Sequence, residues 1–284
     1  MRTLTVRRGA LRLAARTFGN RGPHLVLIHG LASTQRIWDL VIPRLSRSFR
    51  VTTYDQRGHG ESSKPASGYD FANVAADLGA VLRAVKARRP VLVGHSYGAN
   101  VAIEYAASHR RGIAGLVCVD GGMGSMSEIM SWKDAKVMLA PPKLAGLPVD
   151  RLLQFAREGS LAHVWSPQLE QIIRSLFVID DRGRGTPRLA RANHMRILRA
   201  MYGQKPKERL AGVECPALMY LARPRALGME EERGFYEMKK ASVAKIRAEN
   251  PNVKIEWITS IHDIPLDRPR ELAGRIARFA REEV

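Results

Sequence analysis

The sequence predicts an α/β fold in which a mostly parallel sheet carries helices on both faces. Short apolar runs alternate with amphipathic stretches along most of the chain, and most of these runs are continuously apolar. A continuous run of this length is typical of a strand covered on both faces, and strand–helix alternation is typical of parallel sheets. The chain has 284 residues, of which 45% are hydrophobic and 26% charged, enough for one large domain with a sizeable core.

The predicted strands fall into two groups. Leu4–Arg7 and Leu11–Thr17 alternate polar and apolar residues, which is typical of half-exposed strands, and Gly9 lies at the turn between them. The later strands are predicted at His24–His29, Arg50–Asp55, Pro90–Gly94, Ala114–Val119, Pro216–Ala222 and Val253–Ile258.

Helical spacing of apolar residues follows most of these strands. The predicted helices are Trp38–Leu45, Phe71–Ala87, Ala99–Ser108, Glu231–Glu249 and Pro269–Glu282. Asp267 is the expected N-cap of the last helix, with Pro269 in its first turn.

Residues 121–209 interrupt the alternation, because no clear buried strand occurs among them. Helical patterns surround Val149–Arg157, Pro167–Phe177 and Pro187–Tyr202. We therefore expect a helical cap of residues 121–209 inserted into a core domain formed by residues 1–120 and 210–284.

The charge is strongly basic, with 46 Lys and Arg against 27 acidic residues, a net charge of +19. Such a balance is found in proteins that bind polyanions. Here the basic residues are scattered and form no block, so we expect no nucleic-acid partner. A polyanion-binding accessory protein is kept as an alternative, and steep salt-dependent retention on nucleic acid would support it.

Several classes of protein are not expected from this sequence. It lacks an apolar run of about 18 residues, and Met1–Arg8 does not resemble a signal peptide, so we expect a cytoplasmic protein without a membrane span. Cys118 and Cys215 lie in or beside apolar runs and are interpreted as core thiols. No cluster with metal-ligand spacing occurs, and we expect no metal and no cofactor. A homodimer is left open.

The segment Gly94-His95-Ser96-Tyr97-Gly98 matches the pattern G-x-S-x-G between a buried strand and a helix. A serine on such a sharp turn projects its hydroxyl, and its small neighbours let the turn form. The helix N-terminus offers N–H groups to an oxyanion. His29-Gly30-Leu31 follows a neighbouring strand, so we expect the backbone N–H groups of Leu31 and Tyr97 to form an oxyanion hole.

Four features together resemble the α/β-hydrolase superfamily over nearly the whole chain. They are His29-Gly30 with Trp38 downstream, the segment Asp55–Ser62, the Ser96 motif and a late histidine. The resemblance implies an eight-stranded, mostly parallel sheet, a helical cap after the sixth strand and a triad of serine, acid and histidine. It also implies that Asp55–Ser62 is a structural turn.

His262 follows the strand Val253–Ile258 and precedes the last helix, where the resemblance implies the general base. The acid is harder to assign, since Arg225 occupies the region where this family usually has an aspartate. Asp120 ends the strand Ala114–Val119 and is the preferred acid, because a strand end holds a carboxylate rigidly. Glu230, Glu231 and Glu232 are the alternative acids.

The inserted segment is expected to shape the substrate pocket. Met123, Met126 and Trp132 are the pocket candidates, and His163 and His194 are further candidates for contact with substrate.

The expected function is a cofactor-independent serine hydrolase that cleaves esters or lactones of small to medium apolar acids through an acyl-enzyme. The alternatives are a carbon–carbon bond hydrolase or a cofactor-free peroxidase of the same fold, and a non-catalytic ligand-binding protein.

Overall fold

The computed structural model describes residues 1–225 and 230–284, except the side chains of residues 230–232 and 235. Eight strands of this part form one sheet in the order β1-β2-β4-β3-β5-β6-β10-β11. Strand β1 pairs antiparallel with β2, and β2 antiparallel with β4, while the remaining pairs are parallel. The mostly parallel sheet predicted from the sequence is confirmed. The strands are β1 (Arg2–Arg8), β2 (Leu11–Phe18), β3 (His24–Ile28), β4 (Arg50–Tyr54), β5 (Val91–His95), β6 (Gly115–Val119), β10 (Ala217–Arg223) and β11 (Val253–Thr259).

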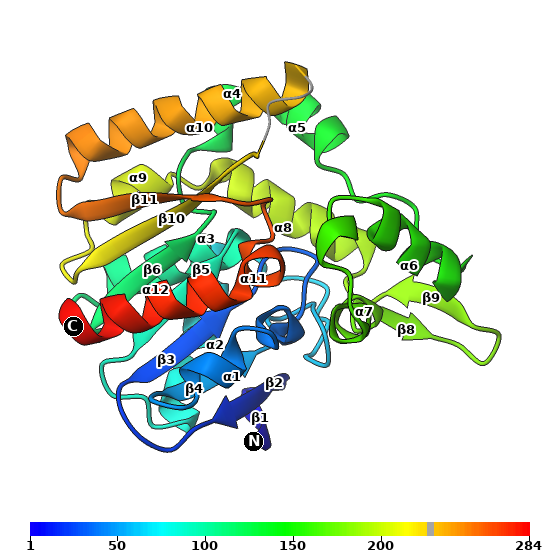
Figure 1. Ribbon diagram of the computed structural model, residues 1–284, viewed down its shortest axis with the longest axis horizontal. Coiled ribbons are helices and arrows are strands. Elements are labelled where there is room, and N and C mark those ends of the chain that lie inside the picture. Colours follow the sequence, from blue (N-terminus) through cyan, green and yellow to red (C-terminus); the bar gives the residue numbers. More distant parts are fainter. Residues whose placement is uncertain (226–229) are drawn as a thin grey trace.

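Helices cover both faces of this sheet, as expected (Figure 1). The helices outside the segment between β6 and β10 are α1 (Ile42–Leu45), α2 (Phe71–Ala84), α3 (Tyr97–Ser108), α10 (Glu230–Glu249), α11 (Ile264–Asp267) and α12 (Pro269–Glu282), with a 3₁₀ turn η1 at Gln35–Trp38.

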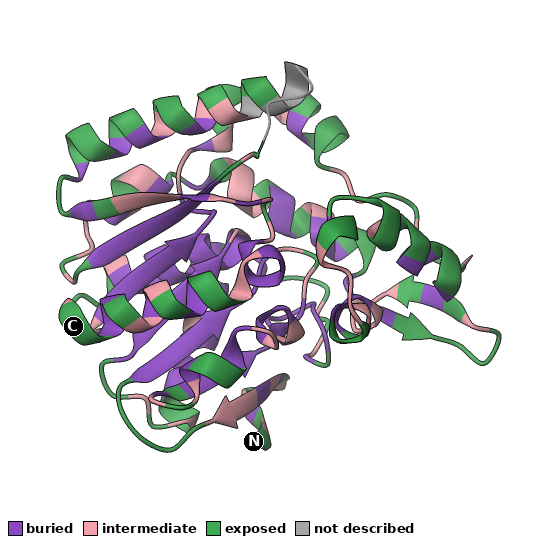
Figure 2. Ribbon diagram, in the orientation of Figure 1, coloured by how far each residue is buried: buried purple, intermediate pink, exposed green. Residues whose placement is uncertain are grey.

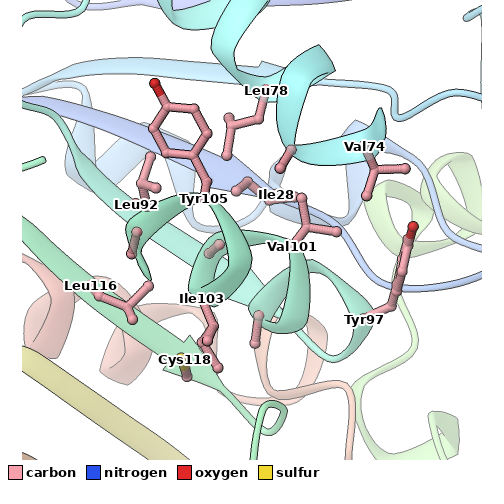
Figure 3. Close-up of a cluster of buried hydrophobic side chains, with 14 of the residues drawn as sticks. Ile28, Val74, Leu78, Leu92, Tyr97, Val101, Ile103, Tyr105, Leu116 and Cys118 are labelled. Atoms are coloured by element: carbon pink, nitrogen blue, oxygen red, sulfur yellow. The ribbon is translucent and has the colours of Figure 1, made fainter. Parts of the chain in front are cut away.

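Side chains of one strand alternate between two apolar clusters, one on each face of the sheet. In β3, Val26 and Ile28 belong to the cluster that includes α2 and α3, whereas Leu25 and Leu27 belong to the cluster that includes α1 and α12. The central strands are buried throughout (Figure 2), and Figure 3 shows Ile28, Leu92 and Leu116 pointing at α2 and α3. Because both faces are covered, these strands read as continuous apolar runs.

The segment between β6 and β10 contains both helices and strands. Its helices are α4 (Met126–Ile129), α5 (Trp132–Met138), α6 (Val149–Glu158), α7 (Pro167–Arg174), α8 (Arg191–Gly203) and α9 (Pro206–Leu210), with a 3₁₀ turn η2 at Ala162–Val164. Its strands β7 (Leu147–Pro148), β8 (Phe177–Ile179) and β9 (Arg184–Pro187) form a small antiparallel sheet. The sequence indicated helices of this segment but not these three strands. These strands are short, and Val178 and Ile179 are exposed, so no buried run marks them.

Two local predictions were wrong. The stretch Trp38–Leu45 is not one helix, because η1 ends at Trp38 and α1 begins only at Ile42, next to Pro43, which tolerates a first helical turn but not a helix interior. Asp267 does not cap α12: the N-cap position is Arg268, and the Asp267 carboxylate accepts hydrogen bonds from Ser260 and Ile261 instead.

Candidate active site

Ser96 lies at the sharp turn between β5 and α3. Its backbone has φ 53° and ψ −122°, in the region that non-glycine residues rarely adopt. The backbone is held there from both sides, since Ser96 N–H donates to Val119 O at 2.9 Å and Ala99 N–H donates to Ser96 O at 2.9 Å. The Ser96 side chain belongs to a half-buried residue above this turn.

The turn is possible because glycines surround it. A Cβ on Gly94 would lie 2.3 Å from Gly98 O, and one on Gly98 would lie 2.3 Å from Ile28 O. A Cβ on Gly121 would lie 2.3 Å from Ser96 O. Three backbone segments therefore meet at Ser96 at distances that no side chain allows, which is the steric reason for the G-x-S-x-G pattern.

The turn after β3 lies directly beside Ser96. A Cβ on Gly30 would lie 3.1 Å from the Cβ of Ser96, so Leu31 follows immediately after the point of closest approach. Among the described residues, no backbone acceptor is found for the N–H of Leu31, nor for that of Tyr97 in the first turn of α3. Both N–H groups are therefore free of backbone acceptors in that part of the chain, and their role as oxyanion donors stays a prediction.

Two buried histidines fix this turn in place. His29 Nε2 accepts from Gln56 N–H at 3.0 Å, and His59 Nε2 accepts from Ala32 N–H at 3.3 Å. Burial lowers the pKa of His29 to about 4 and that of His59 to about 3, so both imidazoles stay neutral and keep an acceptor nitrogen. The segment Asp55–Ser62 thus supports the turn, which is the structural role that the resemblance implies.

His262 and Asp120 come together although 142 residues separate them. His262 follows β11, Asp120 follows β6, and His262 Nδ1 lies 2.6 Å from Asp120 Oδ2. The carboxylate is fully buried, and Ala222 N–H donates to its other oxygen at 2.9 Å. The loop of His262 is fixed by His95, whose Nε2 donates to His262 O at 3.0 Å.

The fold shifts the pKa values of Asp120 and His262 in opposite directions from their ordinary values. Burial disfavours the Asp120 carboxylate, but the hydrogen bond and charge of His262 outweigh this and, with Lys239, hold its pKa below the usual range. Burial also disfavours a charged His262, yet the hydrogen bond that His262 donates to Asp120 and the charge of that carboxylate raise the pKa of His262 above 6.5. The pair therefore favours imidazolium beside carboxylate, the arrangement that a general base needs after accepting a proton.

Lys239 of α10 is a residue of this site that sequence reasoning missed. Its Nζ donates to Asp120 Oδ1 at 2.7 Å, to Asp120 Oδ2 at 2.9 Å and to Ala222 O at 3.1 Å. The side chain is only 6% exposed. A signal for it exists, because Lys239 shares the buried face of α10 with Val243 and Ile246, four and seven residues further on.

Arg225 follows β10, in the region where the resemblance implies an aspartate. Arg225 donates instead to Asp267 Oδ1 at 3.1 Å, on the neighbouring helix α11. The side chains of the alternative acids Glu230, Glu231 and Glu232 lie outside the described residues.

A cavity of about 160 Å³ adjoins Ser96. Met123 and Met126, both proposed from the sequence, line it together with Ile129, Met201 and Met238. Trp132 does not line it: its ring packs on Tyr202, and the guanidinium of Arg199 lies over it at 4.7 Å.

The two histidines of the inserted segment also lie outside this cavity. His163 Nε2 lies 2.7 Å from Asp267 Oδ1, and His194 Nε2 lies 3.3 Å from Leu139 O. In the part of the chain that the structure describes, no three His, Cys, Asp or Glu residues are grouped to hold a metal ion.

None of the helices in residues 1–225 and 230–284 is long and apolar enough to cross a membrane.

Comparison with known proteins agrees with this architecture. The model of the alpha/beta hydrolase fold family matches residues 23–153. A curated relative, the 2-(acetamidomethylene)succinate hydrolase of Mesorhizobium japonicum, is 34% identical over 112 residues, which are 39% of this chain and 40% of the relative. The chain therefore spans less than half the length of that relative.

Solved structures match over nearly the full length. That of an E-2-(acetamidomethylene)succinate hydrolase has a TM-score of 0.79 at 21% identity and covers 98% of both chains. That of an enol-lactonase from Burkholderia xenovorans has a TM-score of 0.73 at 19% identity and covers 99% of this chain and 100% of the other. The sheet order and these structures show that the chain has the alpha/beta hydrolase fold, and residues 23–153 match the model of the family of that fold.

Proposed function

We propose that the protein is a serine hydrolase of carboxylic esters or lactones, with Ser96 as nucleophile, His262 as general base and Asp120 as the acid that orients it. One observation carries the proposal: a strained serine and a buried Asp120–His262 pair joined at 2.6 Å follow strands of the same half of the sheet. Residues 121–209 are proposed as the cap of this site.

The steps follow from the atoms involved. Ser96 Oγ attacks the carbonyl carbon while its proton passes to His262 Nε2, since Nδ1 is bound to Asp120. The N–H groups of Leu31 and Tyr97 stabilise the oxyanion, each typically by about 3 kcal/mol. The imidazolium then protonates the leaving alkoxide. Water, deprotonated by the same imidazole, attacks the acyl-enzyme and releases the acid.

The cavity argues for a small apolar acyl group. Apart from Asn100, Lys239 and two serines, its described side chains are methionines and Ile129, and its volume is about 160 Å³. An apolar cavity of roughly 150 Å³ is large enough for benzene. We therefore expect acyl groups of about six carbons, such as hexanoyl or benzoyl, to fit best.

A fluorophosphonate tests the nucleophile without knowledge of the substrate. Intact-mass analysis of the wild type is expected to show one adduct, and Ser96→Ala none. Ser108→Ala, at the far end of α3, is the matched control and is expected to be labelled like the wild type. A well-folded wild type that takes up no probe would contradict the proposal and favour a ligand-binding protein.

A panel of p-nitrophenyl esters from acetate to decanoate then tests the acyl size. We expect kcat/KM to rise toward hexanoate and to fall for longer chains. A monotonic rise through decanoate would contradict the assignment of this cavity to the acyl group.

The relative suggests a second candidate, hydrolysis of an acylamino dicarboxylate such as 2-(acetamidomethylene)succinate. The apolar lining speaks against it, because Lys239, the cation among the described lining residues, already binds Asp120. Including this compound in the panel, along with a carbon–carbon hydrolase substrate and a peroxidase assay, discriminates between these activities.

A further inference from the structure

Asp120 is surrounded by hydrogen-bond donors, and one of them carries a charge. Ala222 N–H and Lys239 Nζ donate to Oδ1 at 2.9 and 2.7 Å, and Lys239 Nζ and His262 Nδ1 lie 2.9 and 2.6 Å from Oδ2. Lys239 thus bridges both oxygens of the carboxylate.

A buried lysine is costly unless a negative charge neutralises it. The Lys239 side chain is 6% exposed, and the Asp120 side chain is 0% exposed, so the two charges are removed from water together. The consequence concerns His262. When His262 accepts a proton, the new positive charge forms beside a pair that is already neutral, rather than beside a lone carboxylate.

The short distance between Lys239 and His262 makes the effect of the lysine charge on the titration of His262 large. Lys239 Nζ and His262 Nδ1 bind the same oxygen at 2.9 and 2.6 Å, so the two nitrogens lie at most about 5.5 Å apart. At that separation a second positive charge in a partly buried site shifts a titration by about one to two pH units.

We propose that Lys239 is a positioning residue for the hydrolysis proposed above: it fixes the Asp120 carboxylate and balances its charge. His262 then stays neutral, and able to accept the Ser96 proton, at lower pH than it would beside an unpaired aspartate. The inference rests on the proposed function, since it assigns the pH range over which that same site is active.

The other charged groups near His262 do not replace this role. Asp263 is the next residue in the chain, and its side chain is 39% exposed, so water screens it. The ring of His95 lies 5.0 Å from that of His262, and burial lowers the pKa of His95 to about 4, which leaves it neutral near pH 7. Lys239 is therefore the cation that acts on the pair from α10.

The test measures the rate at which a fluorophosphonate labels Ser96 between pH 5 and 9. In this reaction the Ser96 Oγ–P bond forms, the P–F bond breaks, fluoride leaves and the Ser96 proton passes to His262. The rate follows the fraction of neutral His262. In Lys239→Met we expect the acid limb of the profile to move up by about one pH unit or more, with a plateau within tenfold of wild type.

Two controls make the result specific. Lys239→Arg keeps the charge and is expected to restore the wild-type limb. Lys240→Met makes the same change on an exposed lysine of the same helix, 47% exposed, and is expected to leave the limb unchanged.

The outcomes separate the two proposals. A wild type that is not labelled at Ser96 overturns the proposed function. A labelled wild type whose limb is the same in folded Lys239→Met overturns the role of Lys239 alone. If Lys239→Met does not fold, Lys239→Gln takes its place. An acid limb that moves as far in Lys239→Arg as in the neutral variant likewise overturns the role of Lys239.

Discussion

Two histidine–aspartate pairs of nearly equal length occur in this molecule, and their surroundings differ. His262 lies 2.6 Å from Asp120, and His163 lies 2.7 Å from Asp267. Both carboxylates are fully buried. The first pair stands beside the strained Ser96 turn, whereas the second joins the inserted segment to the loop that follows β11.

The second pair shows what a histidine–aspartate contact does without a nucleophile. Asp267 accepts from the Ser260 hydroxyl at 2.8 Å and from Ile261 N–H at 3.2 Å, so it ties down the loop that carries His262. His163, from η2, anchors the inserted segment to the same carboxylate. Whether such a pair can have a catalytic or only a structural role therefore depends on the residues around it.

The largest expected effect separates the two histidines. We expect His262→Ala to lower kcat for the preferred ester by about 10⁴-fold or more, because the general base is lost. We expect His163→Ala to leave kcat within about threefold. We expect it to lower the free energy of unfolding by about 1 kcal/mol, because a hydrogen bond is lost. Steady-state kinetics and urea unfolding of both variants check this. Equal losses of kcat would break the comparison.

The two aspartates should differ in the same way as the two histidines, with kcat depending far more on Asp120 than on Asp267. Asp120→Asn is expected to lower kcat by about 10⁴-fold, since the imidazole loses its orienting charge. It also removes the negative charge that the buried Lys239 binds, at a cost of about 3–5 kcal/mol of unfolding free energy. Asp267→Asn is expected to lower stability while reducing kcat less than about tenfold. Activity assays beside denaturant titrations distinguish the cases, and a loss of kcat in Asp267→Asn as large as in Asp120→Asn would contradict it.

Acid should destabilise the fold through its other histidines. Burial lowers the pKa of His24, His29 and His95 to about 4 and that of His59 to about 3. The unfolded chain binds these protons near pH 6.5, so the free energy of unfolding falls as the pH falls from about 6.5 to 4.

The contribution of His262 to stability changes with pH in the opposite direction. Its pKa is raised, so its contribution to stability is present below pH 6.5 and is lost as the pH rises through its folded-state pKa. Thermal unfolding of wild type and His262→Ala from pH 4 to 9 measures both effects. A melting temperature that is the same at pH 4.5 and 7 would contradict the first, and a difference between the two proteins that does not shrink above neutral pH would contradict the second.

The smallest expected effect concerns the cavity. Met126→Phe narrows the space beside Ser96 and is expected to shift the kcat/KM ratio of acetate to hexanoate esters by about tenfold toward acetate. Met138→Phe changes a methionine that is 69% exposed on α5 and is the matched control. An unchanged ratio in Met126→Phe would remove this cavity from the acyl site.

The sequence was most informative where chemistry needs a local pattern. The strained serine requires small neighbours two residues away, so Gly94, Ser96 and Gly98 mark the turn directly. His262 and Asp120 were found from chain order and from the strands that they follow. Their catalytic roles stay predictions, although the two side chains do meet.

What the sequence did not reveal depends on contacts between distant segments. Lys239 lies 119 residues from Asp120 and beside the exposed Lys240, so composition alone does not distinguish the two lysines. The strands β7–β9 are too short and too exposed to have a clear pattern. Asp267 looked like a helix cap, because its partners Ser260 and His163 are fixed only by the tertiary fold.

The order of these residues along the chain has a consequence for biosynthesis. The turn after β3, Ser96 and Asp120 all precede the inserted segment in the chain. Lys239 and His262 follow β10, after the whole of that segment. A nascent chain therefore carries Ser96, the proposed nucleophile, long before His262, the proposed base. On this assignment the chain that emerges from the ribosome carries an inert precursor of the site, and hydrolysis begins only after β11 joins the sheet and His262 reaches Asp120.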